Sequence, residues 1–305
     1  GGFSEDLPGD FVNAEAETDE KCAKPVIQHE FRWWSSFPDV RLMGKYCGAV
    51  RPYAAEIALR AAEAHGISQV LPAAAANSQR LQFVEAKGKM EICRRDHQRL
   101  AGICHFNAMD ANPSPQGIVD EFYEAKFADA ATWRQTNGDT VILVSLGFDD
   151  RVLGAGETLG CELYVSDFCH SPLREPGLEW ELAAGETRLA EGAMEYRHEP
   201  YCTCKAGGFA VTIPDITRTV AASLRATLRE GQRVFTNAWH VWLFPKEAPL
   251  PSSLALYGTA EHTWLKGLQS VRAVSEEDLA GAAGVRAVLT AVSYTHLTLP
   301  TNREV

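Results

Sequence analysis

The chain has 305 residues, the length of about two domains, and 46% of them are hydrophobic, an ordinary share for a globular protein. The formal net charge of −11 argues against nucleic acid as a partner, because polyanions are held by clusters of Lys and Arg. No apolar run approaches the roughly 18 residues that a membrane helix needs, so we expect no membrane partner. No pattern indicates a cofactor, and the oligomeric state stays open.

Residues 24–34 read Lys-Pro-Val-Ile-Gln-His-Glu-Phe-Arg-Trp-Trp. Pro25 suits the first position of a strand, where no ladder hydrogen bond is lost, so we expect residues 26–28 to be a strand with Glu30 at its C-terminal end. That end of a strand is the catalytic face of a (β/α)-barrel, which makes Glu30 a candidate for chemistry. The alternative is a surface or ion-paired carboxylate. Trp33 adds a flat apolar face of the kind that stacks on sugar rings.

A second segment has the same organisation. Residues 103–106 form a short apolar run bounded by Gly102 and a polar loop, which predicts a buried strand. His105, Asn107 and Asp110 gather at its C-terminal end, and Pro and Gly residues punctuate the loop that follows. Asn107 and Asp110 are candidates for binding sugar hydroxyls or, equally, for capping this loop.

The sequence between the two strands is helical in character. Residues 53–65 are rich in strong helix formers and end at Gly66, a good residue to follow a helix. Residues 73–99 predict a second helix, with Leu81, Val84 and either Gly88 or Ile92 on one apolar stripe. Strand, helices and strand in this order form a βαβ crossover, which requires a parallel sheet.

The two segments resemble the seventh and eighth barrel strands of glycoside hydrolase family 2, which includes β-galactosidases and β-glucuronidases. In that family a Lys-Pro-hydrophobic-x-x-Glu pattern ends on the catalytic nucleophile, and Glu30 takes that position. Residues 117–120 and Lys126 match the second half of the eighth-strand pattern. The family often has a Trp where this chain has His105 or Phe106, a departure that suggests a divergent branch.

The resemblance implies a fragment of a retaining glycoside hydrolase with a carbohydrate substrate and Glu30 as nucleophile. The implied substrate-binding residues are His29, Trp33, His105, Asn107 and Asp110. The acid/base residue of the family lies at the end of the fourth strand, which precedes this sequence, so we expect the fragment alone to be inactive. The family weakly favours a periplasmic or secreted location. The rival hypothesis is a non-catalytic carbohydrate-binding or adhesion module with a degenerate barrel.

After Trp133 the helical runs give way to short strand-like runs separated by Gly, Asp, Pro or Asn. Several alternate in period two, as with Leu178, Trp180 and Leu182 against the glutamates between them, which predicts an antiparallel β-sandwich. Residues 237–245 resemble the last strand of the immunoglobulin-like sandwich that follows the barrel in this family. Trp239 and Trp242 are expected on opposite faces of that strand, with core packing favoured over a sugar platform.

These patterns predict four segments. Residues 1–132 are expected to be the C-terminal part of a (β/α)8 barrel with its strands 7 and 8, residues 133–246 an immunoglobulin-like sandwich, and residues 247–291 the start of a truncated α/β domain. Within the last, residues 268–274 and 284–291 predict strands and Ser275 a helix start. Residues 292–305 resemble translated sequencing adapter rather than natural sequence, the alternative being a Thr-rich strand. Both ends of the chain look like cuts.

The eight cysteines contain no Cys-x-x-Cys pair. The nearest approach to a metal cluster is Cys202-Thr-Cys204 with His198 four residues upstream, and further ligands would be Cys161, Cys169 and His170. Zinc sites normally use wider, paired spacings, so we expect no metal site but strand cysteines that share one face. Cys104 is expected to be a buried, small apolar residue.

Overall fold

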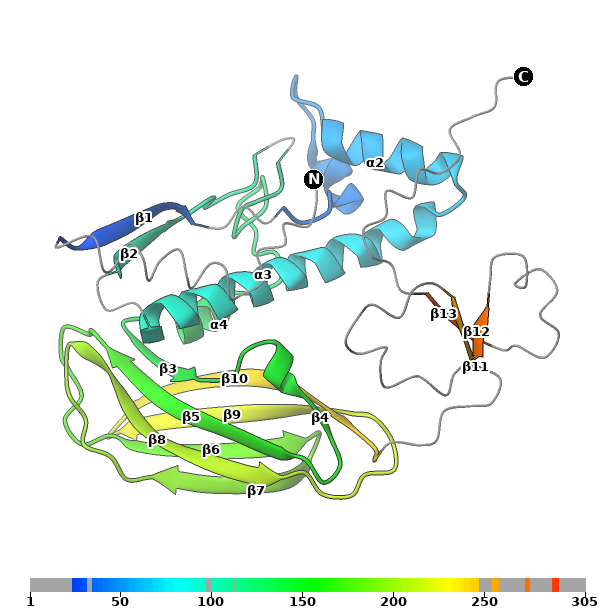
Figure 1. Ribbon diagram of the computed structural model, residues 1–305. Coiled ribbons are helices and arrows are strands. Elements are labelled where there is room, and N and C mark those ends of the chain that lie inside the picture. The colour runs from blue at the N-terminus through cyan, green and yellow to red at the C-terminus, as the bar shows by residue number, and fades with distance from the viewer. Residues whose placement is uncertain are drawn as a thin grey trace. The chain divides into compact units, whose positions relative to one another are not determined.

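The computed structural model describes residues 24–31, 35–96, 100–111 and 114–246, together with three short strands between residues 254 and 290 (Figure 1). The chain divides into two units, residues 1–246 and 247–305. The first unit contains a helical part with a two-stranded sheet and an antiparallel β-sandwich. Strand is the predominant secondary structure.

The first unit begins with the expected βαβ crossover. Its elements are β1 (Val26–Phe31), the 3-10 helix η1 (Val40–Lys45), α2 (Tyr53–Ala64), the 3-10 helix η2 (Ser68–Val70), α3 (Leu71–Asp96) and β2 (Leu100–His105). β1 and β2 pair in parallel, with Val26 opposite Leu100 and Phe31 opposite His105. Gly66 follows α2 with a φ of +68°, a conformation that L side chains rarely adopt, which explains why the helix ends there. The two-stranded sheet does not by itself establish a barrel.

Helix α3 buries only part of the predicted stripe. Leu81 is 47% exposed, whereas Phe83, Met90 and Cys93 are buried. Met90 and Cys93 pack against Phe31 of β1 in a small apolar cluster. The prediction is confirmed for Gly88, which is buried, and was wrong for Leu81. Helix α3 packs on two sides, because one side contacts β1 and β2 and the other contacts the sandwich.

The sandwich consists of two sheets. One has the order β3-β5-β8 and the other β4-β10-β9-β6-β7. The strands are β3 (Thr140–Val144), β4 (Val152–Gly154), β5 (Thr158–Asp167), β6 (Gly177–Ala184), β7 (Thr187–Met194), β8 (Cys202–Thr212), β9 (Val220–Glu230) and β10 (Arg233–Phe244). All pairs are antiparallel except β4 with β10. The predicted sandwich is therefore present, although β4 and β7 were not predicted.

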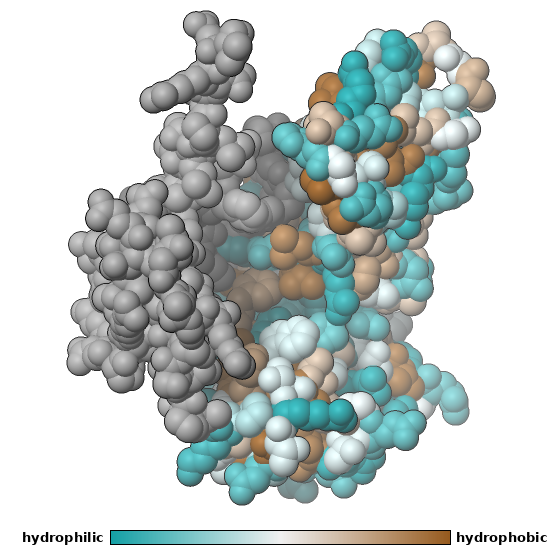
Figure 2. All heavy atoms as spheres, turned by 90° about the vertical axis from the view of Figure 1, so that its right-hand side faces the viewer, coloured by the Kyte–Doolittle hydropathy of each residue, from teal (hydrophilic) through white to brown (hydrophobic). Residues whose placement is uncertain are grey.

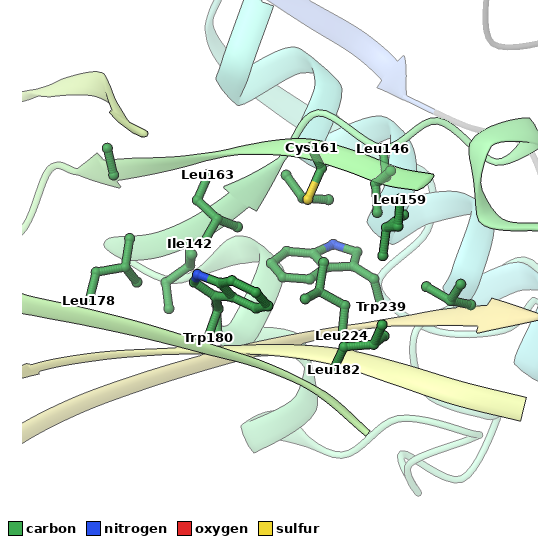
Figure 3. Close-up of a cluster of buried hydrophobic side chains, with 14 of the residues drawn as sticks. Ile142, Leu146, Leu159, Cys161, Leu163, Leu178, Trp180, Leu182, Leu224 and Trp239 are labelled. Carbon is green, nitrogen blue, oxygen red and sulfur yellow. The ribbon is translucent and has the colours of Figure 1, made fainter. Parts of the chain in front are cut away.

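The core of the sandwich lies between the inner faces of the two sheets (Figure 3). Leu178, Trp180 and Leu182 point inward, as their period-two pattern indicated. Trp180 stacks on Phe209 of the facing sheet, with ring centroids 3.7 Å apart. Trp239 also lies in this core at 2% exposure.

The two tryptophans of β10 face opposite sides of the strand, as expected. Trp239 is buried in the core, whereas Trp242 is 47% exposed on the outer face of its sheet. A strand places residues three apart on opposite faces, which accounts for the difference.

Helix α4 (Ala130–Asn137) spans the boundary expected near residue 132. Asp129 caps its N-terminus by accepting a hydrogen bond from the Thr132 N–H at 2.8 Å. The helix leads into β3 through Gly138, whose N–H donates to the Arg134 carbonyl. The division into a barrel remnant and a separate sandwich domain stays a prediction.

A buried polar network joins α3 to the sandwich. The Glu91 carboxylate accepts hydrogen bonds from Trp239 Nε1 at 2.8 Å and Asn237 Nδ2 at 2.7 Å, and it pairs with Lys87 one helical turn away. Lys87 Nζ also donates to Asn237 Oδ1 at 2.7 Å. Asn237 in turn donates to the Ile142 carbonyl. Every member is hydrogen-bonded, which is the condition under which a buried polar network is stable.

At one end of the sandwich, Asp167 is fully buried and forms a second polar cluster. His198 Nε2 lies 3.0 Å from one carboxylate oxygen. Burial alone would raise the pKa of Asp167, but hydrogen bonds to its carboxylate outweigh burial and hold the pKa at about 2. These contacts come from Cys169, the Leu173 N–H, Thr140 and His198.

The depressed pKa of Asp167 predicts an acid-sensitive contribution to stability. Because the pKa is lower in the folded than in the unfolded chain, the stabilisation is complete above about pH 4 and is lost as the pH falls toward 2. We expect Asp167→Asn to remove about 1–2 kcal/mol at pH 7 and little at pH 2. Urea unfolding of both proteins across this pH range measures the difference. An equal difference at both pH values would contradict the prediction.

The second unit contains three short strands, β11 (Leu254–Tyr257), β12 (Arg272–Val274) and β13 (Ala287–Thr290). They form a parallel sheet in the order β12-β11-β13. β12 and β13 lie within the two predicted strand segments, and β11 was not predicted. The helix start at Ser275 and the tail of residues 292–305 lie outside the described residues.

Apolar side chains are exposed on and beside α2, among them Val50 at 65%, Tyr53 at 55% and Ile57 at 59%. On the described surface in Figure 2, hydrophobic residues are interspersed with hydrophilic ones. Cys104 of β2 is also exposed, against expectation, because the described elements leave its side of the two-stranded sheet uncovered. Within the described residues no helix is long and apolar enough to span a membrane.

Candidate functional site at the carboxyl ends of β1 and β2

Because β1 and β2 are parallel, the segments that follow them leave the sheet at the same edge. The Phe106 N–H donates to the Phe31 carbonyl at 3.3 Å, so the two strands remain paired to their ends. Glu30 is the penultimate residue of β1, inside the strand rather than beyond it. The side chains of His29 and Glu30 and the whole of Trp33 lie outside the described residues.

The segments that follow the two strands pack against each other. The N–H and hydroxyl of Ser36 both donate to the Pro115 carbonyl, at 2.8 and 3.1 Å. Tyr46 donates to Glu121 at 2.9 Å, and the ring of Tyr46 contacts Phe122 edge to face. These contacts connect positions 75 or more residues apart in the chain, so the two segments form one surface.

This surface contains a small pocket with both polar and apolar walls. Its lining includes Ser36, Asp39, Tyr46, Asp110 and Glu121. Burial, followed by the hydrogen bond to Glu121, raises the pKa of Tyr46 to about 12, so its hydroxyl remains a donor at neutral pH. The polar groups of its wall are already hydrogen-bonded within the protein, as Tyr46 is to Glu121, and Phe37, Leu42 and Ala55 contribute apolar wall.

Asp110 is brought to this pocket, but its contacts are those of a loop cap. One carboxylate oxygen accepts from the Gly117 N–H at 2.6 Å and from Lys126 Nζ at 3.0 Å. Asp110 and Lys126 each keep only 4% of their side chains exposed. Burial raises the pKa of Asp110 and lowers that of Lys126, and the pairing of the two opposes both shifts.

Gly117 is required for this arrangement. A Cβ at this position would lie 2.2 Å from the backbone nitrogen of Asp110, closer than any side chain can approach. The loop between β2 and α4 is therefore held by a glycine contact and a buried ion pair. Of the two hypotheses for Asp110, its contacts match capping.

We expect Asp110→Asn to lower the free energy of unfolding by about 2 kcal/mol, because the amide keeps the Gly117 contact but leaves Lys126 without a buried counter-charge. The double variant Asp110→Asn/Lys126→Met removes that unpaired charge and should recover part of the loss. Chemical denaturation of the three proteins tests this. The ion-pair explanation would be contradicted if the double variant loses more free energy of unfolding than the two single variants lose together.

His105 lies at the C-terminus of β2 and lines a second small pocket with Phe83, Lys126 and Trp133. Its ring contacts Trp133 at a centroid distance of 6.0 Å, and its Nδ1 is buried without a hydrogen-bond partner. Burial, followed by the charge of Lys126, lowers the pKa of His105, so the imidazole is neutral at pH 7. A neutral imidazole binds or exchanges protons but does not offer a positive charge.

Asn107 participates in the site through its backbone. Its N–H donates to Gln116 and its carbonyl accepts from Ile118, which joins the two sides of the loop after β2. The side chain is half-buried. The structure thus places Asp110 at one pocket and His105 at the other, with Gln79 of α3 lining both.

Several residues of this surface were not predicted from the sequence. Ser36 and Glu121 lie in irregular segments, and Asp39 and Tyr46 flank η1, so no periodic pattern marks them. One signal was available for Asp39, which accepts from the Arg41 N–H as the N-cap of η1. No group of three His, Cys, Asp or Glu side chains is arranged to hold a metal ion in the part of the chain that the structure describes.

Residues 157–245, from β5 to β10, match the family described as Domain of unknown function (DUF8488). No curated protein matches the chain. Among solved structures, the chain is similar to a calcium-binding mutant of β-glucuronidase 2 from Bacteroides uniformis, at 15% identity and a TM-score of 0.24. That alignment covers 83% of this chain and 25% of the other.

The chain is also similar to the β-glucuronidase of Parabacteroides merdae, at 10% identity and a TM-score of 0.25, over 34% of this chain and 13% of that one. A third similar structure is the CARDB domain of a Pyrococcus furiosus protein, at 14% identity and a TM-score of 0.24, over 35% of this chain and 96% of that one. This chain therefore spans a small part of either glucuronidase. At these identities and scores, the likenesses assign no activity to it.

Proposed function

We propose that this chain is part of a retaining glycoside hydrolase in which Glu30 is the nucleophile. The observation that carries the proposal is the parallel pairing of β1 and β2 across α2 and α3, with Glu30 next to the end of β1. In parallel α/β sheets, catalytic residues lie at the carboxyl ends of strands. The two segments that follow the strands meet at this edge and line a small pocket with both polar and apolar walls.

In this proposal β1 and β2 are the last two strands of a (β/α)8 barrel, and the acid/base residue lies outside this sequence. Retaining glycosidases need two carboxyl groups about 5–5.5 Å apart, one as nucleophile and one as acid and base. Glu30 attacks the anomeric carbon and displaces the leaving group, and water then hydrolyses the glycosyl ester.

The substrate-binding roles differ among the candidate residues. His105 offers a neutral imidazole at the second pocket, whereas the Tyr46 hydroxyl at the first pocket already donates its hydrogen to Glu121. Asp110 is proposed to act indirectly, since its carboxylate already holds Gly117 and Lys126. His29, Trp33 and Asn107 remain candidates from the sequence.

The second candidate function is a non-catalytic carbohydrate-binding module. A specific observation favours it: Trp242 and Phe244 are 47% and 41% exposed on the outer face of β10, and Val152 of the paired strand β4 is 56% exposed. Exposed aromatic faces on a rigid sheet suit stacking on sugars. In this case binding would depend on Trp242 and would not require Glu30.

One experiment separates the two functions. A longer reading frame that contains this sequence is expressed and assayed on a panel of aryl glycosides, and activated 2-fluoro glycosides are used to trap a covalent intermediate. The proposal expects hydrolysis and a glycosyl group on the peptide that contains Glu30. Absence of turnover, together with glycan binding that Trp242→Ala removes, would support the binding module instead.

A further inference from the structure

A strained backbone position lies in the turn that follows β2. Tyr123 has a φ of +63°, in the left-handed region that side chains other than those of Asn and Asp rarely adopt. Tyr201 is the one other non-glycine residue with a positive φ in the part of the chain that the structure describes. A bulky aromatic side chain makes this conformation costly in free energy, and such positions persist where another benefit offsets the cost.

The turn is a tight hairpin whose left-handed position ordinarily holds a glycine. The Tyr123 N–H donates to the Asp120 carbonyl at 3.1 Å, and the Asp120 N–H donates to the Glu124 carbonyl at 2.9 Å. Residues 121–123 therefore form a three-residue loop with its last residue in the left-handed region, where Gly is preferred because it has no Cβ. Tyr123 departs from this local rule, and departures of this kind are expected at functional sites.

Neighbouring residues fix this turn in place. The buried Asp120 carboxylate accepts hydrogen bonds from the N–H groups of Phe122 and Glu124 at 2.8 and 2.9 Å. The Phe122 ring packs edge to face on Tyr46, which lies in the segment after β1. Lys45 of η1 pairs with Glu124 at 2.6 Å. The turn is thus held against the segment after β1, at the edge of the sheet where the candidate site lies.

The side chain of Tyr123 does not stabilise the fold in a way that offsets this cost. It is 73% exposed, the largest exposed fraction of any large hydrophobic residue in the described part of the chain. Within the described residues, no hydrogen bond, ion pair or ring contact involves this side chain. The packing of the protein itself therefore gives no reason for a tyrosine at this position, which leaves a contact with another molecule as the reason.

We propose that Tyr123 stacks on the leaving group of the glycoside and so determines specificity in the proposed hydrolase, on which this choice of ligand rests. Tyr123 lines neither pocket of the candidate site, so it is placed to contact a part of the substrate beyond the sugar that Glu30 attacks. Aromatic side chains stack on the apolar face of another ring. The carboxylates of Glu121 and Glu124 in the same turn disfavour an anionic group, so the favoured leaving group is a neutral sugar or aryl ring.

The test uses the longer protein and the substitution Tyr123→Asn, because Asn adopts the left-handed conformation more readily than Tyr. We expect KM for aryl glycosides to rise by about 3- to 10-fold, the effect of losing one aromatic stacking contact. A glycosyl fluoride has no ring in its leaving group, so its hydrolysis should keep the wild-type kcat/KM. Tyr123→Phe retains the ring and should keep the wild-type KM. The urea midpoint of Tyr123→Asn should rise, because the strained residue is replaced by one that suits the turn.

The matched control is Tyr201→Asn, the same change at the other described tyrosine with a positive φ, which is 59% exposed and precedes β8 of the sandwich. It should raise the urea midpoint similarly and leave the hydrolysis of both substrates unchanged. The inference is overturned if Tyr123→Asn leaves KM for aryl glycosides unchanged, or if it impairs hydrolysis of the fluoride equally. In either case the proposed hydrolase still stands.

A different result separates the failure of the proposed function. If the wild-type protein hydrolyses neither the aryl glycosides nor the fluorides, the proposed hydrolase is wrong. Saturation-transfer NMR with the same aryl glycosides then decides the role of Tyr123. Binding that Tyr123→Asn weakens and Tyr201→Asn does not weaken would support Tyr123 as a ring-binding residue. Absence of binding, or equal binding by both variants, would overturn the inference.

Discussion

Glu91→Ala is expected to lower the free energy of unfolding by about 3–5 kcal/mol, one of the two largest effects we predict for this chain. The change removes the acceptor for the Trp239 and Asn237 donors and the counter-charge of Lys87. Burial already lowers the pKa of Lys87, although Glu91 opposes that shift, so loss of Glu91 leaves an ammonium group buried and unpaired. Removing one partner of a buried ion pair costs about this much because the other charge has no compensation.

The control for this variant is Glu63→Ala, which truncates an exposed glutamate on α2. We expect that change to lie within about 0.5 kcal/mol of wild type. Urea unfolding, followed by tryptophan fluorescence and by far-UV circular dichroism, measures both. If Glu91→Ala is as mild as Glu63→Ala, the network contributes nothing to the attachment of α3 to the sandwich.

The same network connects residues on the two sides of the boundary expected near residue 132, which stays a prediction. The sequence pattern changes there from helical runs to short alternating strands. However, Glu91 on α3 and Asn237 on β10, 146 positions apart, are hydrogen-bonded to each other. No local pattern marks such a contact, because each residue alone reads as an ordinary polar side chain. The first unit extends to Lys246 and so includes residues on both sides of position 132.

The sandwich was largely predictable because its strands alternate in period two. β7 was missed because residues 187–194 include Ala190, Gly192 and Ala193, small residues that are depleted in strands. The structure explains why position 192 is a glycine. A Cβ at this position would lie 2.8 Å from Trp180 Nε1 on the paired strand β6, a contact that the sequence of β7 alone does not indicate.

At the candidate site, the sequence located the region better than it assigned the roles. The position of Asp110 after a strand predicted the edge of the sheet near which it lies. Its partner Lys126 lies 16 positions away, and the ion pair between them depends on how the loop folds. Likewise, Tyr46 and Glu121 meet only because two irregular segments pack together.

Glu30→Gln is expected to reduce glycoside hydrolysis by the longer protein more than about 1000-fold, while the free energy of unfolding changes little. The amide has nearly the shape of the carboxylate but is a far weaker nucleophile, and the covalent step has no other group to perform it. The penultimate position of Glu30 in β1, at the edge where the following segments form the first pocket, is the structural basis for the expectation. The assay uses the best aryl glycoside substrate of the wild-type protein.

The matched control is Glu63→Gln, the same chemical change on the exposed face of α2, which should keep wild-type turnover. An added small nucleophile such as azide should partly restore cleavage of an activated substrate by Glu30→Ala, because it can occupy the space of the lost carboxylate and attack the anomeric carbon. The glycosyl azide formed would have the configuration opposite to that of the normal product, since only one displacement occurs. Retained turnover in Glu30→Gln, or rescue that gives the normal configuration, would assign the nucleophile to another residue.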